Sequence, residues 1–293
     1  MININSVPEY LTYLEKINTI NRSTYTVGCF TLYRGQANYK WDLNPSLYRS
    51  DLFKEESLLL TEAKSICPNE FLNSRFETLV KMQHFGMPTR LLDTTTNPLV
   101  ALYFACASNN ETESDGAVYI FPNLPVSWST DPLIDLIMDF IFEHCPIQCC
   151  LEDILNVSKE KYKNVVHRLM PDSVDSLLHY LTIPAFAVMP DKTNERIQAQ
   201  DGAFFVCGMA LENIKISTNP GTLGKRYYNF SPVDLKSNET IWKDSQKIVI
   251  PNSAKGQILS QLDIIGINES KLFPDLEHKI QHVIRNVQLH RFR

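Results

Sequence analysis

Apolar residues recur along this chain at spacings that predict both helices and strands. Residues 2–18 predict a helix covering the core, because four apolar residues follow helical spacing: Val7, Leu11, Leu14 and Ile17. Residues 52–80 predict one or two amphipathic helices with a break near Pro68. Residues 117–121 form a continuous apolar run bounded by turn residues, which predicts an inner strand.

The helix that the pattern defines best begins after Asn97. No residue from Leu99 to Ala107 is charged, and apolar residues occupy every face, as in a helix buried inside a domain. Asn97 can accept hydrogen bonds from the first free amides as the N-cap. Pro98 fits the first helical position, where its missing N–H costs nothing.

The remaining elements complete an α+β pattern. Residues 131–180 predict a helical insertion that caps a site or faces a partner. The C-terminal part predicts a strand at 247–250, a helix at 255–262 and a closing helix at 275–287. We therefore expect a single domain over residues 1–293, with a central mixed or antiparallel sheet and surrounding helices.

The length, composition and charge of the chain disfavour several functional classes of protein. The chain has 293 residues, of which 44% are hydrophobic and 21% charged, enough for a full core in one elaborated domain. A net charge of −5 disfavours general nucleic-acid or membrane-surface binding, which needs a basic excess. No apolar run reaches the roughly 20 residues of a membrane span. The first residues also lack the pattern of a secretion signal, so we expect a cytoplasmic protein.

The seven cysteines predict reduced thiols rather than a disulfide framework, because several lie in apolar segments and no C-x-x-C pair repeats. One group offers several metal ligands: Glu143, His144, Cys145, Cys149 and Cys150. Its spacing fits no standard zinc pattern, and adjacent cysteines rarely face the same ion. We therefore expect no metal.

Three polar clusters lie beside apolar elements. In the first, a short strand at 31–33 runs into Arg34-Gly35-Gln36, where the five-donor fork of Arg34 suits a phosphate or carboxylate. The second precedes the buried helix, whose N-terminus favours an anionic group, and contains Thr89, Arg90, Asp93, Thr94, Thr95 and Thr96. The third, residues 195–206, passes through Gly202 into an apolar strand. One rigid pocket would account for all three clusters.

Several of these polar residues can also have purely structural roles. Arg34 and Asp93 can form a buried ion pair that locks two loops together. His84 can be a hydrogen-bonded structural histidine or a catalytic base. The stretch Gln198-Ala199-Gln200 can be an ordinary edge strand.

The clusters together resemble the FRG-domain family, which takes its name from a Phe/Tyr-Arg-Gly motif that stands here as Tyr33-Arg34-Gly35. The resemblance continues through Pro88-Thr89-Arg90-Leu91-Leu92-Asp93 and through residues 97–105, which read NPLVALYFA. It extends in order over roughly residues 26–284 and includes Arg196, Gln200 and Lys255.

The order of the clusters is also similar to that of ADP-ribosyltransferases, which carry an arginine, a Ser-Thr-Ser loop and a Glu-x-Glu strand. That resemblance implies that Arg34 holds the NAD pyrophosphate and that Thr94 to Thr96 brace the nicotinamide ribose. The third element departs from the pattern, because Gln198-Ala199-Gln200 lacks the expected glutamate. A glutamine can hydrogen-bond a ribose hydroxyl but supplies no charge to a cationic ribose. Glu195 and Asp201 are nearby substitutes.

The resemblance implies an NAD-using ADP-ribosyltransferase-like enzyme, of the kind that acts as a bacterial or phage-conflict effector, with an unidentified acceptor macromolecule. It assigns catalytic roles to Arg34, Thr95, Gln200 and Glu195, and ligand-binding roles to Arg34, Gln36, Thr89, Arg90, Asp93, Thr94 and Thr96. One alternative is a sensing module that binds NAD or another phosphate-bearing nucleotide without chemistry. The other is an interaction protein that acts through residues 131–180.

Overall fold

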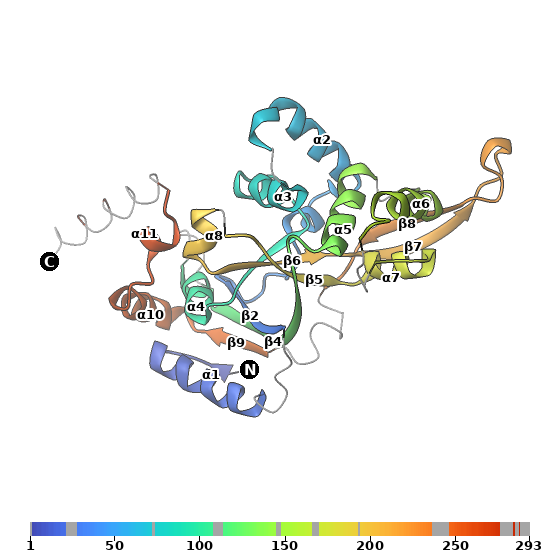
Figure 1. Ribbon diagram of the computed structural model, residues 1–293. Coiled ribbons are helices and arrows are strands. Elements are labelled where there is room, and N and C mark those ends of the chain that lie inside the picture. Colours follow the sequence, from blue (N-terminus) through green and yellow to red (C-terminus); the bar gives the residue numbers. More distant parts are fainter. Residues whose placement is uncertain are drawn as a thin grey trace.

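The computed structural model has an α+β fold built around one central sheet (Figure 1). It describes residues 2–21, 28–71, 74–107, 114–144, 148–165, 170–192, 194–235 and 246–275, together with residues 284 and 287. The predicted helix at 275–287 lies almost wholly outside these described residues, as does Cys145.

The sheet is mixed, as the sequence predicts. Its strand order is β1-β9-β4-β2-β3-β6-β5, and β4 also pairs with β5. The strands are β1 Ile2–Asn3, β2 Cys29–Gln36, β3 Leu91–Thr95, β4 Gly116–Trp128, β5 Ala185–Met189, β6 Gly202–Cys207 and β9 Gln246–Ile250. Because the long strand β4 pairs with β2 and then with β5, the strands β4-β2-β3-β6-β5 close into a ring. The sequence did not predict this closure.

Alternate residues of these strands fill the ring. Leu32 of β2, Leu92 of β3, Phe121 of β4 and Phe205 of β6 are buried in one apolar cluster. The rings of Phe121 and Phe205 meet edge to face, with centroids 5.1 Å apart. Side chains alternate between the two faces of a strand, so the residues between these positions face outward toward the helices.

One group of helices covers β2, β4 and β9. It comprises α1 Val7–Asn21, α4 Pro98–Cys106 and α10 Asn252–Ile264, which share an apolar cluster with those strands (Figure 1). Helix α4 lies directly against β2 at Gly35, where an added Cβ would come within 1.9 Å of the Ala101 carbonyl oxygen. The glycine of the Tyr33-Arg34-Gly35 motif is therefore required by packing, because any side chain would displace α4.

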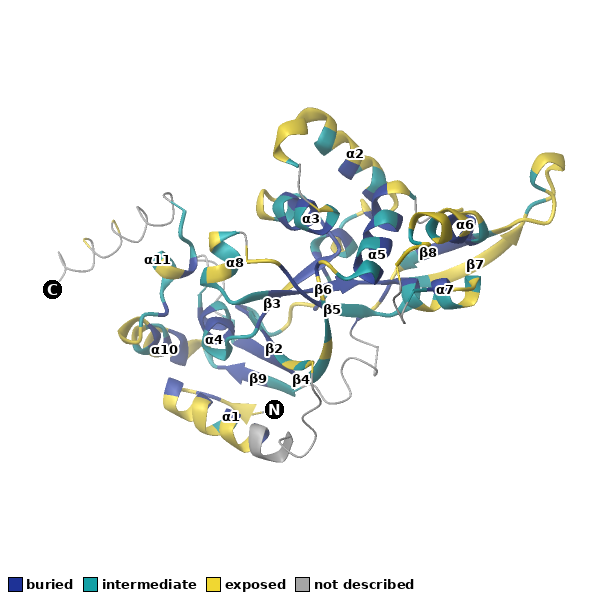
Figure 2. Cartoon of the chain, in the orientation of Figure 1, coloured by how far each residue is buried: buried dark blue, intermediate teal, exposed yellow. Residues whose placement is uncertain are grey.

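A second group of helices covers β3, β5 and β6. Its main members are α2 Glu56–Ile66, α3 Arg75–His84 and α5 Pro132–Glu143. Next to them, α6 Leu151–Lys161 and α7 Val174–Thr182 pack against a separate sheet of β7 Met209–Ile216 and β8 Arg226–Pro232. This two-stranded sheet extends away from the central sheet, and most of β7 is exposed (Figure 2). The short helices are α8 Glu195–Ala199, α11 Glu269–Leu272 and the 3-10 turns Ser46–Arg49, Phe53–Glu55, Pro68–Glu70 and Pro220–Thr222.

The observed elements agree with some of the local predictions and differ from others. The helical pattern of residues 131–180 and the break at Pro68 are confirmed. The first helix begins at Val7 rather than at residue 2, because Ile2 and Asn3 pair in parallel with β9. The interpretation of Gln198-Ala199-Gln200 as an edge strand is wrong, because these residues form the end and the C-cap of helix α8. The six cysteines within the described ranges are free thiols.

Helix α4 begins as predicted, and its cap can be tested. The Asn97 side chain accepts a 3.0 Å hydrogen bond from the Leu99 N–H and donates one of 3.0 Å to the Asp201 carboxylate. Asn97→Ala should therefore lower the free energy of unfolding by about 0.5–2 kcal/mol in urea denaturation. Asn97→Ser keeps a capping oxygen and should retain more of this stability. Equal unfolding midpoints for Asn97→Ala and the wild type would show that the cap does not stabilise α4.

Candidate functional site

The three polar clusters meet at one cavity of about 280 Å³. Helices α3 and α8 and strands β2, β3 and β6 contribute most of its wall. The lining residues are Tyr33, Arg34, Gly35, Val80, Gln83, His84, Asp93, Thr94, Thr95, Phe104, Asn194, Arg196, Ile197, Gln200, Gly202, Ala203 and Phe204. Of the predicted site residues, the structure thus brings Arg34, Asp93, Thr94, Thr95 and Gln200 together.

Arg34 enters the site from β2. Its guanidinium donates from Nη1 to the backbone carbonyl of Asp93, while its buried Nε has no hydrogen-bond partner. The contact with Asp93 is therefore made through the backbone, and the predicted ion pair between the two side chains is not formed. Burial lowers the pKa of Arg34, because the charged form is poorly solvated there. An anion that reaches this guanidinium would supply the missing acceptor.

Arg196 of α8 brings a second guanidinium to the cavity. Its Nη1 lies 3.2 Å from Nδ1 of His84, and the group stands over the Phe273 ring at 4.7 Å. Arginine has donors only, so His84 accepts at Nδ1, which favours the structural interpretation of that histidine. Burial lowers the pKa of Arg196 as well. The cavity thus contains two partly desolvated cations.

Asp93 supplies the only carboxylate among the lining residues that the structure describes. It lies in β3 beside the inward-facing Leu92, and so on the outer face where α3 packs. Gln83 of α3 donates a 2.8 Å hydrogen bond from Nε2 to Asp93 Oδ1. Gln83 and Arg196 are not among the predicted site residues, although Arg196 lies within the third cluster.

The threonines of the second cluster have different environments. Thr95 donates a 2.7 Å hydrogen bond to the Gln200 carbonyl, and the Thr96 hydroxyl lies 3.4 Å from the Asp201 carbonyl. These two hydroxyls therefore join β3 to the third cluster, and Thr96 does not line the cavity. The buried hydroxyl of Thr94, in contrast, has no hydrogen-bond partner.

The N-terminus of α4, where the sequence predicts an anionic group, already has partners within the protein. Asn97 caps it, and the Asp201 carboxylate already lies beside that cap. Gln200 lines the cavity, but its Nε2 donates to the Leu272 carbonyl at 3.0 Å. Glu195 is exposed on α8 and does not line the cavity, so the structure does not support it as a substitute acid.

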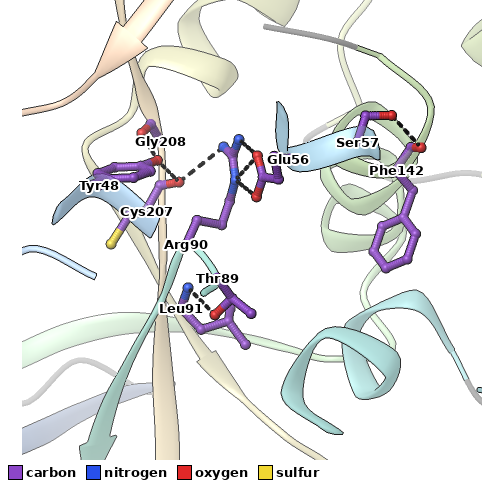
Figure 3. Close-up of polar contacts among 9 residues, drawn as sticks. All are labelled: Tyr48, Glu56, Ser57, Thr89, Arg90, Leu91, Phe142, Cys207 and Gly208. Atoms are coloured by element: carbon purple, nitrogen blue, oxygen red, sulfur yellow. Dashed lines mark hydrogen bonds and ion pairs between the residues drawn. The ribbon is translucent and has the colours of Figure 1, made fainter. Parts of the chain in front are cut away.

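The remaining predicted ligand residues lie outside the lining. Arg90 is buried against Glu56 of α2, with Nε 2.8 Å from Oε1, and its Nη1 donates to the Cys207 carbonyl at 3.3 Å (Figure 3). The Glu56 carboxylate raises the pKa of Arg90 despite its burial. Arg90 therefore joins α2 to the strands. Gln36 and Thr89 are also buried and do not line the cavity.

Residues 30–114 match the family model of the FRG domain. The chain therefore carries an FRG domain, as the sequence predicts. The match includes Arg34, Gln83 and Asp93 but ends before the third cluster. No curated protein and no solved structure matches the chain.

The described ranges lack two further features. No group of three or more histidine, cysteine, aspartate or glutamate side chains is placed to hold a metal ion there. None of the helices in those ranges is long and apolar enough to cross a bilayer.

Proposed function

We propose that the cavity binds NAD and that the protein is an ADP-ribosyltransferase-like enzyme. The observation that carries this proposal is a pair of buried polar atoms at the cavity, Arg34 Nε and Thr94 Oγ1, that have no partner. Such atoms are costly to bury unless a ligand satisfies them. A guanidinium donor and a hydroxyl at one cavity suit a phosphate next to a ribose.

Asp93, the single carboxylate among the described lining residues, is a group that could also take part in chemistry on the bound NAD. In ADP-ribosyl transfer the bond between ribose C1′ and the nicotinamide nitrogen breaks, its electron pair leaves with nicotinamide, and an acceptor nucleophile bonds to C1′ and loses a proton. Asp93 would stabilise the positive charge that develops on the ribose, and Arg34 would hold the phosphates. This assigns to Asp93 the role for which the sequence suggested Gln200 or Glu195.

Sensing without chemistry is the second candidate, and one observation favours it. The third cluster contributes Asn194, Arg196, Ile197 and Gln200 to the lining but no acid. A cavity with two arginines and one carboxylate also suits a nucleotide that is bound and not cleaved. Nicotinamide release separates the two candidates, because only the transferase produces it. A cytoplasmic location is part of both proposals, and the free cysteines fit a reducing compartment.

Arg34→Lys tests the binding half of the proposal. Lysine keeps the charge but lacks the planar fork and the Nε donor, so NAD should bind about 10- to 100-fold more weakly in isothermal titration calorimetry, as expected for a charge-assisted hydrogen bond. The matched control is Arg226→Lys, because Arg226 is an exposed residue of β8 that pairs with Glu152. The affinity of the Arg226→Lys variant for NAD should equal that of the wild type.

Equal affinities in Arg34→Lys and the wild type would remove Arg34 from the binding site. A much lower melting temperature with unchanged affinity would instead show that Arg34 acts only in the fold.

A further inference from the structure

Asp93 lies at the end of a chain of hydrogen bonds that runs from the backbone of its own strand. The Leu91 N–H donates to Thr89 Oγ1 at 3.2 Å, as seen in Figure 3. The Thr89 hydroxyl in turn donates to Oε1 of Gln83, and Gln83 Nε2 donates to Asp93 Oδ1.

The Asp93 carboxylate fixes the direction of this chain, because it can only accept, and the start of the chain is compatible with that direction. A backbone amide can only donate, so the Thr89 oxygen accepts from Leu91 and its proton is available for Gln83. Thr89 itself is held, because its side chain is fully buried and its N–H donates to the Ser46 hydroxyl at 3.2 Å. If the Gln83 amide turned over, its oxygen would face the Asp93 carboxylate, and two acceptors would oppose each other.

We infer that Gln83 is a positioning residue, and that the buried Thr89 hydroxyl anchors its side chain so that the Asp93 carboxylate is held in one direction at the cavity. The inference deepens the proposed function and rests on it for its catalytic consequence. Without the Thr89 hydroxyl the Gln83 amide loses its buried anchor and can swing away from Asp93, which then loses its only hydrogen bond from α3 among those described. Small displacements of a reacting group cost large factors in rate, so this orientation matters for turnover.

Thr89→Val and Thr89→Ser form the matched pair that tests the inference in the full chain. Valine removes the hydroxyl at nearly the same volume, whereas serine keeps it. The first readout is the side-chain amide resonance of Gln83 in the ligand-free protein, followed by NMR and assigned by its loss in Gln83→Met. It should move in Thr89→Val and in Asp93→Asn and stay in place in Thr89→Ser.

The second readout is nicotinamide release from NAD. Gln83→Met and Thr89→Val should lower kcat by about 10- to 100-fold, as loss of an orienting partner does, while KM changes less than about threefold. Thr89→Ser should keep most of the wild-type kcat. Gln83 is partly exposed on α3, so Gln83→Met tests the inference even if Thr89→Val does not fold.

The two proposals fail in different ways. A Gln83 resonance that is the same in the wild type and Thr89→Val overturns the inference, whether or not NAD is cleaved. If the wild type does release nicotinamide, an equal kcat in Gln83→Met overturns it too. Resonances that move as expected in a protein that never releases nicotinamide support the orientation of Asp93 by Gln83 and contradict the transferase.

Discussion

Asp93→Asn should reduce nicotinamide release by about 100- to 1000-fold, which is the usual cost of removing one preorganised electrostatic group at a reacting centre. Asparagine has nearly the same shape but carries no charge to stabilise the cationic ribose. Affinity for NAD should change much less than kcat, because Arg34 and Thr94 remain in place. Nicotinamide measured by chromatography, together with calorimetric titration of NAD, checks both expectations.

Asp51→Asn is the matched control, since Asp51 is an exposed turn residue that does not line the cavity. Its kcat should equal that of the wild type. If Asp93→Asn released nicotinamide at the wild-type rate, the carboxylate would have no part in the chemistry.

The second large effect concerns stability. Glu56→Gln should lower the free energy of unfolding by about 3–5 kcal/mol, because it leaves the Arg90 guanidinium charged and without its counterion in the interior. Both side chains of this pair are only 3% exposed, so water cannot replace the lost partner. Urea denaturation followed by circular dichroism measures the change.

Two further variants give this stability prediction its controls. Glu160→Gln removes an exposed ion pair with Lys163 and should leave the unfolding midpoint close to that of the wild type. The double variant Glu56→Leu, Arg90→Met removes both buried charges and should recover much of the lost stability. A loss for Glu56→Gln no greater than that for Glu160→Gln would mean that the buried pair does not stabilise the fold.

The sequence predicted those elements whose pattern is local. Helix α4 is apolar on every face and has an Asn-Pro start, so its position and burial follow from about ten residues. Ring closure depends instead on β4 meeting β5, which lies about 60 residues further along the chain, and no local pattern encodes that pairing. The two-residue strand β1 is too short for any periodicity, and only its pairing with β9 defines it.

The candidate site likewise contains residues that the sequence predicted and residues that only the packing defines. The three polar clusters indicated that Arg34, Asp93 and Gln200 share a cavity, which they do, although Arg34 and Asp93 lie within strands and Gln200 is the C-cap of α8. Arg90 has the same chemistry as Arg34, and only the packing of Glu56, which is 34 residues earlier, turns it toward the interior. Gln83 was missed because a glutamine on an amphipathic helix is ordinary in sequence. Its significance comes from its contacts with Thr89 and Asp93.

The most direct test of this account is to incubate the purified 293-residue chain with NAD and to measure free nicotinamide over time. Nicotinamide should accumulate in proportion to protein concentration and should be nearly absent with Asp93→Asn. NAD that stays intact at every protein concentration, while calorimetry shows that it binds, would contradict the transferase and leave a nucleotide-binding module. NAD that is neither bound nor cleaved would contradict the assignment of this cavity as a nucleotide site.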